Sequence, residues 1–185
     1  HIIFGHSFNQ PLDNALCNCK SLTSIDFSYR FNYPISNVLN ILPSLYHLGL
    51  GIDFNQKENL PFNIKSLSLS CNNMFYTEHL PDGIEEIELK MYFDLDLNDL
   101  PSTIKKIKFH KCSKYDRELN CLPNGLEVLE LPPGYNKQIK NIPRELKIFI
   151  CSENYKFIKD FVNFKLETYL EYNKAVYALY SNINN

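Results

Sequence analysis

A short phrase that recurs about every 20 residues constrains this chain more than any other feature. Its template is Leu-Pro-x-x-Leu-x-x-Leu-x-Leu, and copies begin at Leu60, Leu80, Leu100, Leu122 and Ile142, with a copy one residue shorter at Leu42. The apolar residue that follows each Leu-Pro pair, with its counterpart in a degenerate first copy, falls at Leu22, Leu45, Ile64, Ile84, Ile104, Leu126 and Leu146. The steps are therefore 23, 19, 20, 20, 22 and 20 residues. A period of this size predicts a solenoid, in which each repeat packs only on its neighbours.

The end of the phrase predicts a short strand, because Leu-x-Leu puts alternate side chains on opposite faces. Strands one repeat apart are expected to pair as a parallel sheet, with the Leu and Ile side chains pointing into the core. The Leu-Pro pair lies on the return leg of each repeat, and proline disfavours a helix interior there. A period of about 20 residues is also too short for a full helix. We therefore expect extended or 3-10 segments on the return side.

A second phrase lies between the Leu-Pro phrases and begins with an aromatic residue. It reads Phe8-Asn9-Gln10-Pro11-Leu12, then Phe31-Asn32-Tyr33-Pro34-Ile35, then Phe54-Asn55-Gln56. Weaker copies begin at Phe75, Phe93, Tyr115, Tyr135 and Tyr155. We expect each aromatic ring to stack on its counterparts in the neighbouring repeats. The adjacent Asn is expected to bond backbone groups that the turn leaves unpaired.

The two phrases together resemble the FNIP repeat, a relative of the leucine-rich repeat that occurs in social amoebae and in giant viruses of amoebae. The resemblance covers about residues 1 to 155 and is weak where Asn is replaced, at Tyr76 and Lys156. It implies a leucine-rich-repeat-like solenoid with a parallel β-sheet on the concave face and extended or 3-10 segments on the convex side. FNIP-repeat proteins often carry an F-box, so the resemblance also implies a substrate receptor of a cullin ubiquitin ligase. The expected location is the cytoplasm, which would be the host's for a viral protein.

The pattern divides the chain into a solenoid over residues 1–159, with seven to eight repeats of 19–23 residues, and a tail over residues 160–185. In the tail, apolar and aromatic residues recur at helical spacing. They are Val162, Leu166, Tyr169, Leu170, Val176, Tyr177 and Tyr180. We predict a helix over roughly residues 163–181 that caps the last core layer, or alternatively binds a partner. Ile2 and Phe4 fill the last apolar slots of a repeat, so we expect the chain to be a fragment without its N-terminal start.

The template also predicts which side chains share the concave face, meaning the side of the sheet that points away from the core. Aligned repeats give a small polar zone, a charged zone and a zone with apolar residues. The predicted partner-binding residues are Ser24, Asp26, His47, Ser66, Ser68, Glu86, Glu88, Lys106, Lys108, Val128, Glu130, Ile148 and Ile150. At the template position just before Ser66, Glu86, Lys106, Val128 and Ile148, the sign of the charge alternates from one repeat to the next. This column reads Lys65, Glu85, Lys105, Glu127 and Lys147.

Each zone also has a structural interpretation. The small polar zone fits an ordinary solvated strand surface, and the apolar zone fits a surface covered by the C-terminal tail. In the charged zone, Lys106 and Lys108 are expected to be ion-pair partners of Glu86 and Glu88, which would make the zone a structural network. The functional interpretation joins the zones into one protein-binding surface, because a solenoid offers a long, rigid face.

Composition argues against several other classes. The net charge of −2 gives no reason to expect nucleic acid as a partner. There is no signal peptide and no apolar run of ~18 residues, so no membrane association is expected. The six cysteines form no Cys-x-x-Cys pair and the histidines have no ligand spacing, so no metal or cofactor is expected. We expect reduced thiols and an intracellular protein, with Cys151 in a core position.

An enzyme is not expected, because the histidines fall at unrelated repeat positions and suggest no Ser/His/Asp set. The repeats also resemble the leucine-rich domains of secreted bacterial ligase effectors, which carry a catalytic Cys after the repeats. No Cys follows Cys151 in this sequence. The main alternative to a partner-binding scaffold is a structural or self-associating repeat protein, so we expect a monomer or a weak homo-oligomer.

Overall fold

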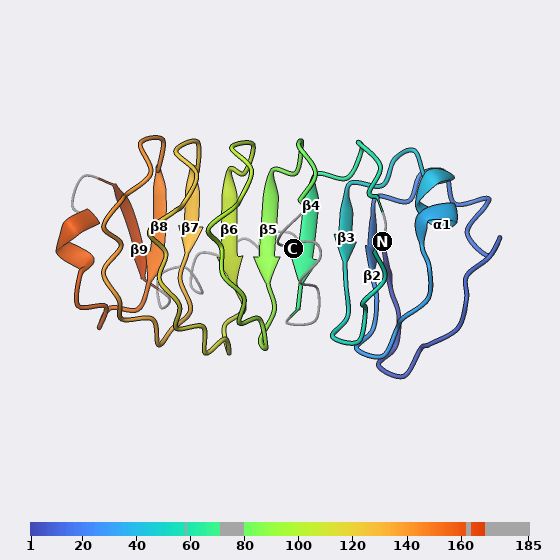
Figure 1. The fold of residues 1–185 in the computed structure, drawn as a ribbon, viewed down its shortest axis with the longest axis horizontal. Helices are drawn as coiled ribbons and strands as arrows, with labels where there is room; N and C mark the ends of the chain where they lie inside the picture. The colour runs from blue at the N-terminus through green and yellow to red at the C-terminus, as the bar shows by residue number, and fades with distance from the viewer. Residues whose placement is uncertain (58, 71–79, 162–163, 169–185) are drawn as a thin grey trace, which may run out of the picture.

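Short strands stand side by side along the length of the molecule and form one parallel sheet (Figure 1). The computed structural model describes residues 1–57, 59–70, 80–161 and 164–168, and within them the sheet has nine strands. The strands are β1 (Ile2–Ile3), β2 (Ser24–Asp26), β3 (His47–Gly49), β4 (Ser66–Leu69), β5 (Glu86–Leu89), β6 (Lys106–Phe109), β7 (Val128–Glu130), β8 (Ile148–Cys151) and β9 (Lys165–Thr168). Their order in the sheet is their order in the chain, so each repeat adds one strand. The predicted solenoid is confirmed.

The register of the sheet follows the repeat template. Ser66 pairs with Glu86, Glu86 with Lys106, and Lys106 with Val128, so residues at one template position lie in a line across the strands. A slip of one residue would turn the buried Leu and Ile side chains to the other face, which is why the apolar pattern fixes this register.

The core consists of the apolar template positions stacked from repeat to repeat. Ile25, Leu48, Leu67, Ile107 and Leu129 are all 0% exposed. Each such side chain contributes roughly 1.5–3 kcal/mol when it is removed from water. The solenoid is therefore held together by a continuous apolar column, with no single centre.

Cys151 takes one of these core positions and is 1% exposed. Burial raises the pKa of its thiol to about 11, which keeps the group neutral at physiological pH. The prediction that it serves as a small hydrophobic residue is confirmed.

The aromatic residues of the second phrase form stacks along the solenoid. The ring centroid of Phe31 lies 5.9 Å from that of Phe8 and 6.2 Å from that of Phe54, and both pairs are nearly parallel. The Phe93 and Tyr115 rings stack in the same way at 6.0 Å. These contacts confirm the predicted aromatic column for these repeats, whereas the Tyr135 and Tyr155 rings, 6.3 Å apart, are tilted by 33°.

The Asn residues beside the aromatics connect successive repeats. The Oδ1 atom of Asn9 accepts a hydrogen bond from the backbone N–H of Asn32 at 3.1 Å, and that of Asn32 accepts one from Asn55 at 3.1 Å. Asn136 accepts in the same way from the N–H of Lys156. We call this series the asparagine ladder. It satisfies backbone donors that lie beyond the ends of the strands.

The return legs are mostly turns and extended chain, as predicted, with a 3-10 helix η1 at Ile158–Phe161. One short α-helix, α1 (Ser36–Asn40), differs from the prediction and lies in one of the longest repeats. The additional residues give room for a helical turn, and the Val38 and Leu39 side chains of this turn are buried. No helix within the described part of the chain is long and apolar enough to cross a bilayer.

The predicted C-terminal helix is wrong over residues 165–168, because they form β9 and pair with β8 in parallel. The exposed backbone edge of β8 explains this, since another strand satisfies its N–H and C=O groups and a helix does not. The remainder of the predicted helix, apart from Phe164, lies outside the described residues.

Candidate partner-binding face

The predicted site residues lie in two lines across the concave face. The first row contains Ser24, His47, Ser66, Glu86, Lys106, Val128 and Ile148. The second row contains Asp26, Gly49, Ser68, Glu88, Lys108, Glu130 and Ile150. The structure thus brings every predicted residue onto one face, although it does not expose them equally.

Four of the predicted residues are buried and present little surface to a partner. Ser66 is 7% exposed, Ser68 0%, Glu130 8% and Ile150 2%. The sequence pattern placed them on the outward side of the strands, but it did not show how closely neighbouring side chains on that side would cover them. The surface available for contact is therefore narrower than predicted.

A polar depression of about 250 Å³ occupies the middle of the concave face, over β3 to β6. Its lining includes His47, Ser66, Glu86, Lys106 and Lys108. It therefore offers carboxylates and ammonium groups side by side, on adjacent strands. This arrangement suits a partner that carries both charges.

The charged side chains in the depression are paired loosely. The Nζ atom of Lys106 lies 3.7 Å from Oε2 of Glu86, and these side chains are 33% and 37% exposed. A pair of this kind contributes only about 0–1 kcal/mol to stability, because water competes for both groups. The predicted pairing of Glu86 with Lys106 is confirmed.

In the second row, an ion pair joins β6 to β7. Lys108, which was expected to pair with Glu88, lies 3.8 Å from the carboxylate of Glu130. Glu88 accepts a hydrogen bond from the Ser68 hydroxyl at 2.7 Å. Burial raises the pKa of Glu130, and the charge of Lys108 opposes that rise. Removing Lys108 would therefore leave a largely buried carboxylate without its cation.

A second polar cluster joins Asp26, His47 and Lys90 at the N-terminal part of the face. Oδ1 of Asp26 lies 3.6 Å from Nε2 of His47 and 3.8 Å from Nζ of Lys90. Lys90 also donates a hydrogen bond to the Leu50 carbonyl at 3.2 Å. Gly49 makes room for the cluster, because a Cβ there would overlap the Asp26 carboxylate. The interaction with His47 is the largest cause that lowers the pKa of Asp26, and Lys90 adds to it.

The same cluster places an Asp, a His and a Ser on three neighbouring strands, a set that the sequence did not suggest. Nδ1 of His47 lies 2.9 Å from Oγ of Ser66. Acyl transfer also needs free N–H donors beside the nucleophile, and the N–H of Ser66 is bonded to the Tyr46 carbonyl at 3.1 Å. Within the described residues there is likewise no group of side chains that could hold a metal ion. We interpret the set as polar contacts between side chains that stabilise three neighbouring strands of the sheet.

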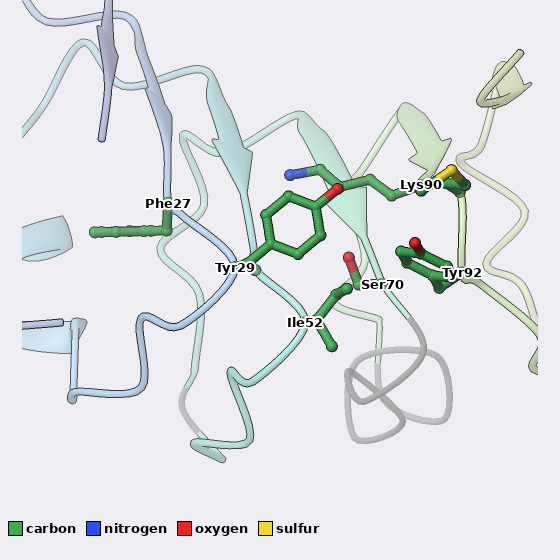
Figure 2. A pocket seen from close by; sticks show the side chains of 8 residues that line it. Phe27, Tyr29, Ile52, Ser70, Lys90 and Tyr92 are labelled. Carbon is green, nitrogen blue, oxygen red and sulfur yellow. The ribbon is translucent and has the colours of Figure 1, made fainter. Parts of the chain in front are cut away.

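A small cavity at the carboxyl ends of β2 to β5 was missed by the sequence analysis. Figure 2 shows the Lys90 side chain extending past the Tyr29 ring, with Tyr92 beside it. The cavity holds about 50 Å³, which is enough for one or two water molecules but not for a larger ligand. Tyr29 and Tyr92 lie beyond the aligned strand positions, so only an alignment extended into the turns could have drawn attention to them.

Acidification is expected to remove the stabilisation from the Asp26 cluster. The folded-state pKa of Asp26 is below its ordinary value of 3.8, so its contribution is present above that pH and is lost as the pH falls toward the folded value. Asp26→Asn should therefore lower the melting temperature at pH 6 and have a smaller effect at pH 3. Circular dichroism melts of both proteins at the two pH values check this. An equal effect at both would contradict the assignment.

Comparison with known proteins supports the fold. No protein-family model and no curated protein matches the chain. Among solved structures, the chain is similar to CroV588, a giant-virus protein described as a novel circular LRR protein structure, with a TM-score of 0.57 over 83% of this chain. This chain folds as a leucine-rich-repeat-like solenoid.

The sequence identity to CroV588 is 20%, so the likeness concerns the fold alone. The chain spans about 27% of the length of that protein. The narrower resemblance to the FNIP repeat, and with it the link to an F-box, stays a prediction.

Proposed function

We propose that this chain is a recognition module that binds a protein partner through the concave face. The observation that supports it best is the first row, in which Glu86, Lys106, Val128 and Ile148 lie in register on four neighbouring strands and are all partly exposed. A rigid sheet holds these side chains in place before binding, so little ordering entropy is lost when a partner docks.

The loose pairing of Glu86 with Lys106 favours recognition over a purely structural role. At 3.7 Å and about one-third exposure, each group keeps part of its hydration, and a partner charge can replace that water. A tightly bonded and buried pair would have no such capacity. The resulting complementarity governs which partner binds more than it governs total affinity.

The resemblance to FNIP-repeat proteins supports a more specific role. In that role the module holds the substrate of a cullin ubiquitin ligase, while an F-box in the same protein docks the ligase. The partner on the concave face is then a protein destined for ubiquitination.

An affinity capture with matched variants tests the proposal. The chain is immobilised and exposed to lysate from cells in which it occurs, beside the exchange Glu86→Lys with Lys106→Glu and the control exchange Glu85→Lys with Lys105→Glu. The control reverses an exposed pair 3.0 Å apart at the position before the first row, so it alters charge to the same extent at another place. Lys108 is left unchanged because of its contact with Glu130.

We expect the original chain and the control variant to capture a protein that the Glu86/Lys106 variant does not capture. Circular dichroism melts establish that all three proteins are folded. Equal retention by all three would refute binding through the first row. A solution mass that doubles with concentration, with nothing captured, would instead favour the self-associating alternative.

A further inference from the structure

We infer that the segment recognised on the concave face is an α-helix that lies along the first row, across β5 to β8. Its successive turns carry a basic residue, an acidic residue and two apolar residues. This inference rests on the proposed function and specifies the partner that it requires.

The exposed surface narrows along this part of the face, from two residues wide over β5 and β6, where Glu88 and Lys108 are also accessible, to one residue wide over β7 and β8. Glu86, Lys106, Val128 and Ile148 are partly exposed, whereas Glu130 and Ile150, beside the last two, are buried. A surface only one or two residues wide matches the contact stripe of one helix, in which residues at every third or fourth position face the same way. A broad flat surface would not favour a helix in this way.

The spacing of the strands favours a helix over an extended peptide. Neighbouring strands lie about 4.8 Å apart, so the row from β5 to β8 extends about 14 Å. Three helical turns rise about 16 Å. In an extended chain, side chains on one side recur about every 6.7 Å, which gives about 20 Å over the same three steps. Flexible side chains can absorb a mismatch of about 2 Å, but not one of about 6 Å.

The charges along the row determine the order of the partner's residues. Acidic side chains lie on β5, where Glu88 is exposed beside Glu86. Basic side chains lie on β6, where Lys108 flanks Lys106. The complementary helix therefore places Lys or Arg over β5 and Glu or Asp over β6, at positions i and i+4. Leu or a similar residue follows at i+7 and i+11, over Val128 and Ile148.

Synthetic peptides with matched composition test the inference by fluorescence anisotropy at low salt. The first is a side-chain-stapled, alanine-based helix with Lys, Glu, Leu and Leu at i, i+4, i+7 and i+11. The second is the same helix with Lys and Glu exchanged. The third carries the four residues at i, i+2, i+4 and i+6, which matches an extended chain. Each is titrated against the original protein and against the Glu86→Lys, Lys106→Glu exchange.

The original protein is expected to bind the first helix at least about tenfold more tightly than the second. The exchanged protein should reverse that preference, because its row now presents the opposite charge order. Only recognition along the row predicts this reciprocal change. A nonspecific apolar contact would give equal binding to both helices.

Equal or tighter binding of the extended peptide, or binding of no peptide, would overturn the helix as the recognised element. The helix inference would also be overturned if the mass of the original protein in solution doubled with concentration while the exchanged protein stayed monomeric. The first row would then bind a second copy of the chain. The proposed function fails separately, if lysate capture does not depend on the Glu86/Lys106 exchange. The two failures are thereby distinguishable.

Discussion

Replacement of Phe31 by alanine is expected to lower the free energy of unfolding by about 4 kcal/mol, the loss typical of a fully buried Phe. Phe31 is 0% exposed. Its ring centroid lies 4.1 Å from that of Phe27, and it stacks between Phe8 and Phe54. The substitution therefore opens a cavity that touches three neighbouring repeats. The surrounding rings cannot collapse into it, because the strands that position them are fixed by the sheet.

Urea unfolding followed by circular dichroism measures this effect, and Phe62→Ala is its matched control. Phe62 is 91% exposed, so the same chemical change there should alter the free energy of unfolding by less than about 0.5 kcal/mol. Because contacts in a solenoid are local, Phe31→Ala should also broaden the transition, with the N-terminal repeats unfolding first. Similar values for the two variants would show that the aromatic column does not stabilise the fold.

Gly51→Ala should destabilise the protein by about 3 kcal/mol or more, which is large for the addition of one methyl group. A Cβ at Gly51 would overlap the carbonyl oxygen of Ser28 and lie 2.8 Å from its carbonyl carbon. It would also lie 3.1 Å from the Tyr29 carbonyl oxygen, which accepts a hydrogen bond from the N–H of Asp53. All three atoms belong to the backbone of the neighbouring repeat, so no side chain can rotate to make room.

Gly134→Ala provides the control for the Gly51 substitution. No atom lies within 4 Å of a Cβ built at Gly134, so alanine there should be neutral or slightly stabilising. Thermal melts of both variants, together with backbone amide NMR spectra, would locate any change. Unchanged stability in Gly51→Ala would mean that the turns after β2 and β3 are further apart than the structure shows.

The fold was largely predictable because one apolar pattern repeats. The Leu and Ile positions can be buried only if every strand adds in the same register, and this requirement alone places Glu86 beside Lys106. The aromatic column followed from the same argument. Each of these features depends on residues that recur, so their neighbours are known from the period alone.

Features that depend on a single repeat were not predictable. The α1 helix forms in the repeat after β2 but not in the equally long repeat after β1, and β9 forms because the edge of β8 is open to pairing. In the site, Lys90 reaches Asp26 across the intervening strands, and Gly49 leaves room for the Asp26 carboxylate. Such contacts depend on side-chain length and direction, which the alternation of apolar and polar residues does not specify.

The asparagine ladder has a consequence for how this chain can be lengthened. Its hydrogen bonds join residues 23 positions apart at Asn9 and Asn32 but 20 apart at Asn136, although they serve the same point in each coil. The number of residues between each strand and its ladder asparagine is thus constant. The repeats differ in length in the segment between that asparagine and the next Leu-Pro pair. Foreign loops grafted after Asn40, the exposed last residue of α1, should be accommodated there without displacing the sheet. The protein would then serve as a display scaffold whose recognition surface and insertion sites lie on opposite sides.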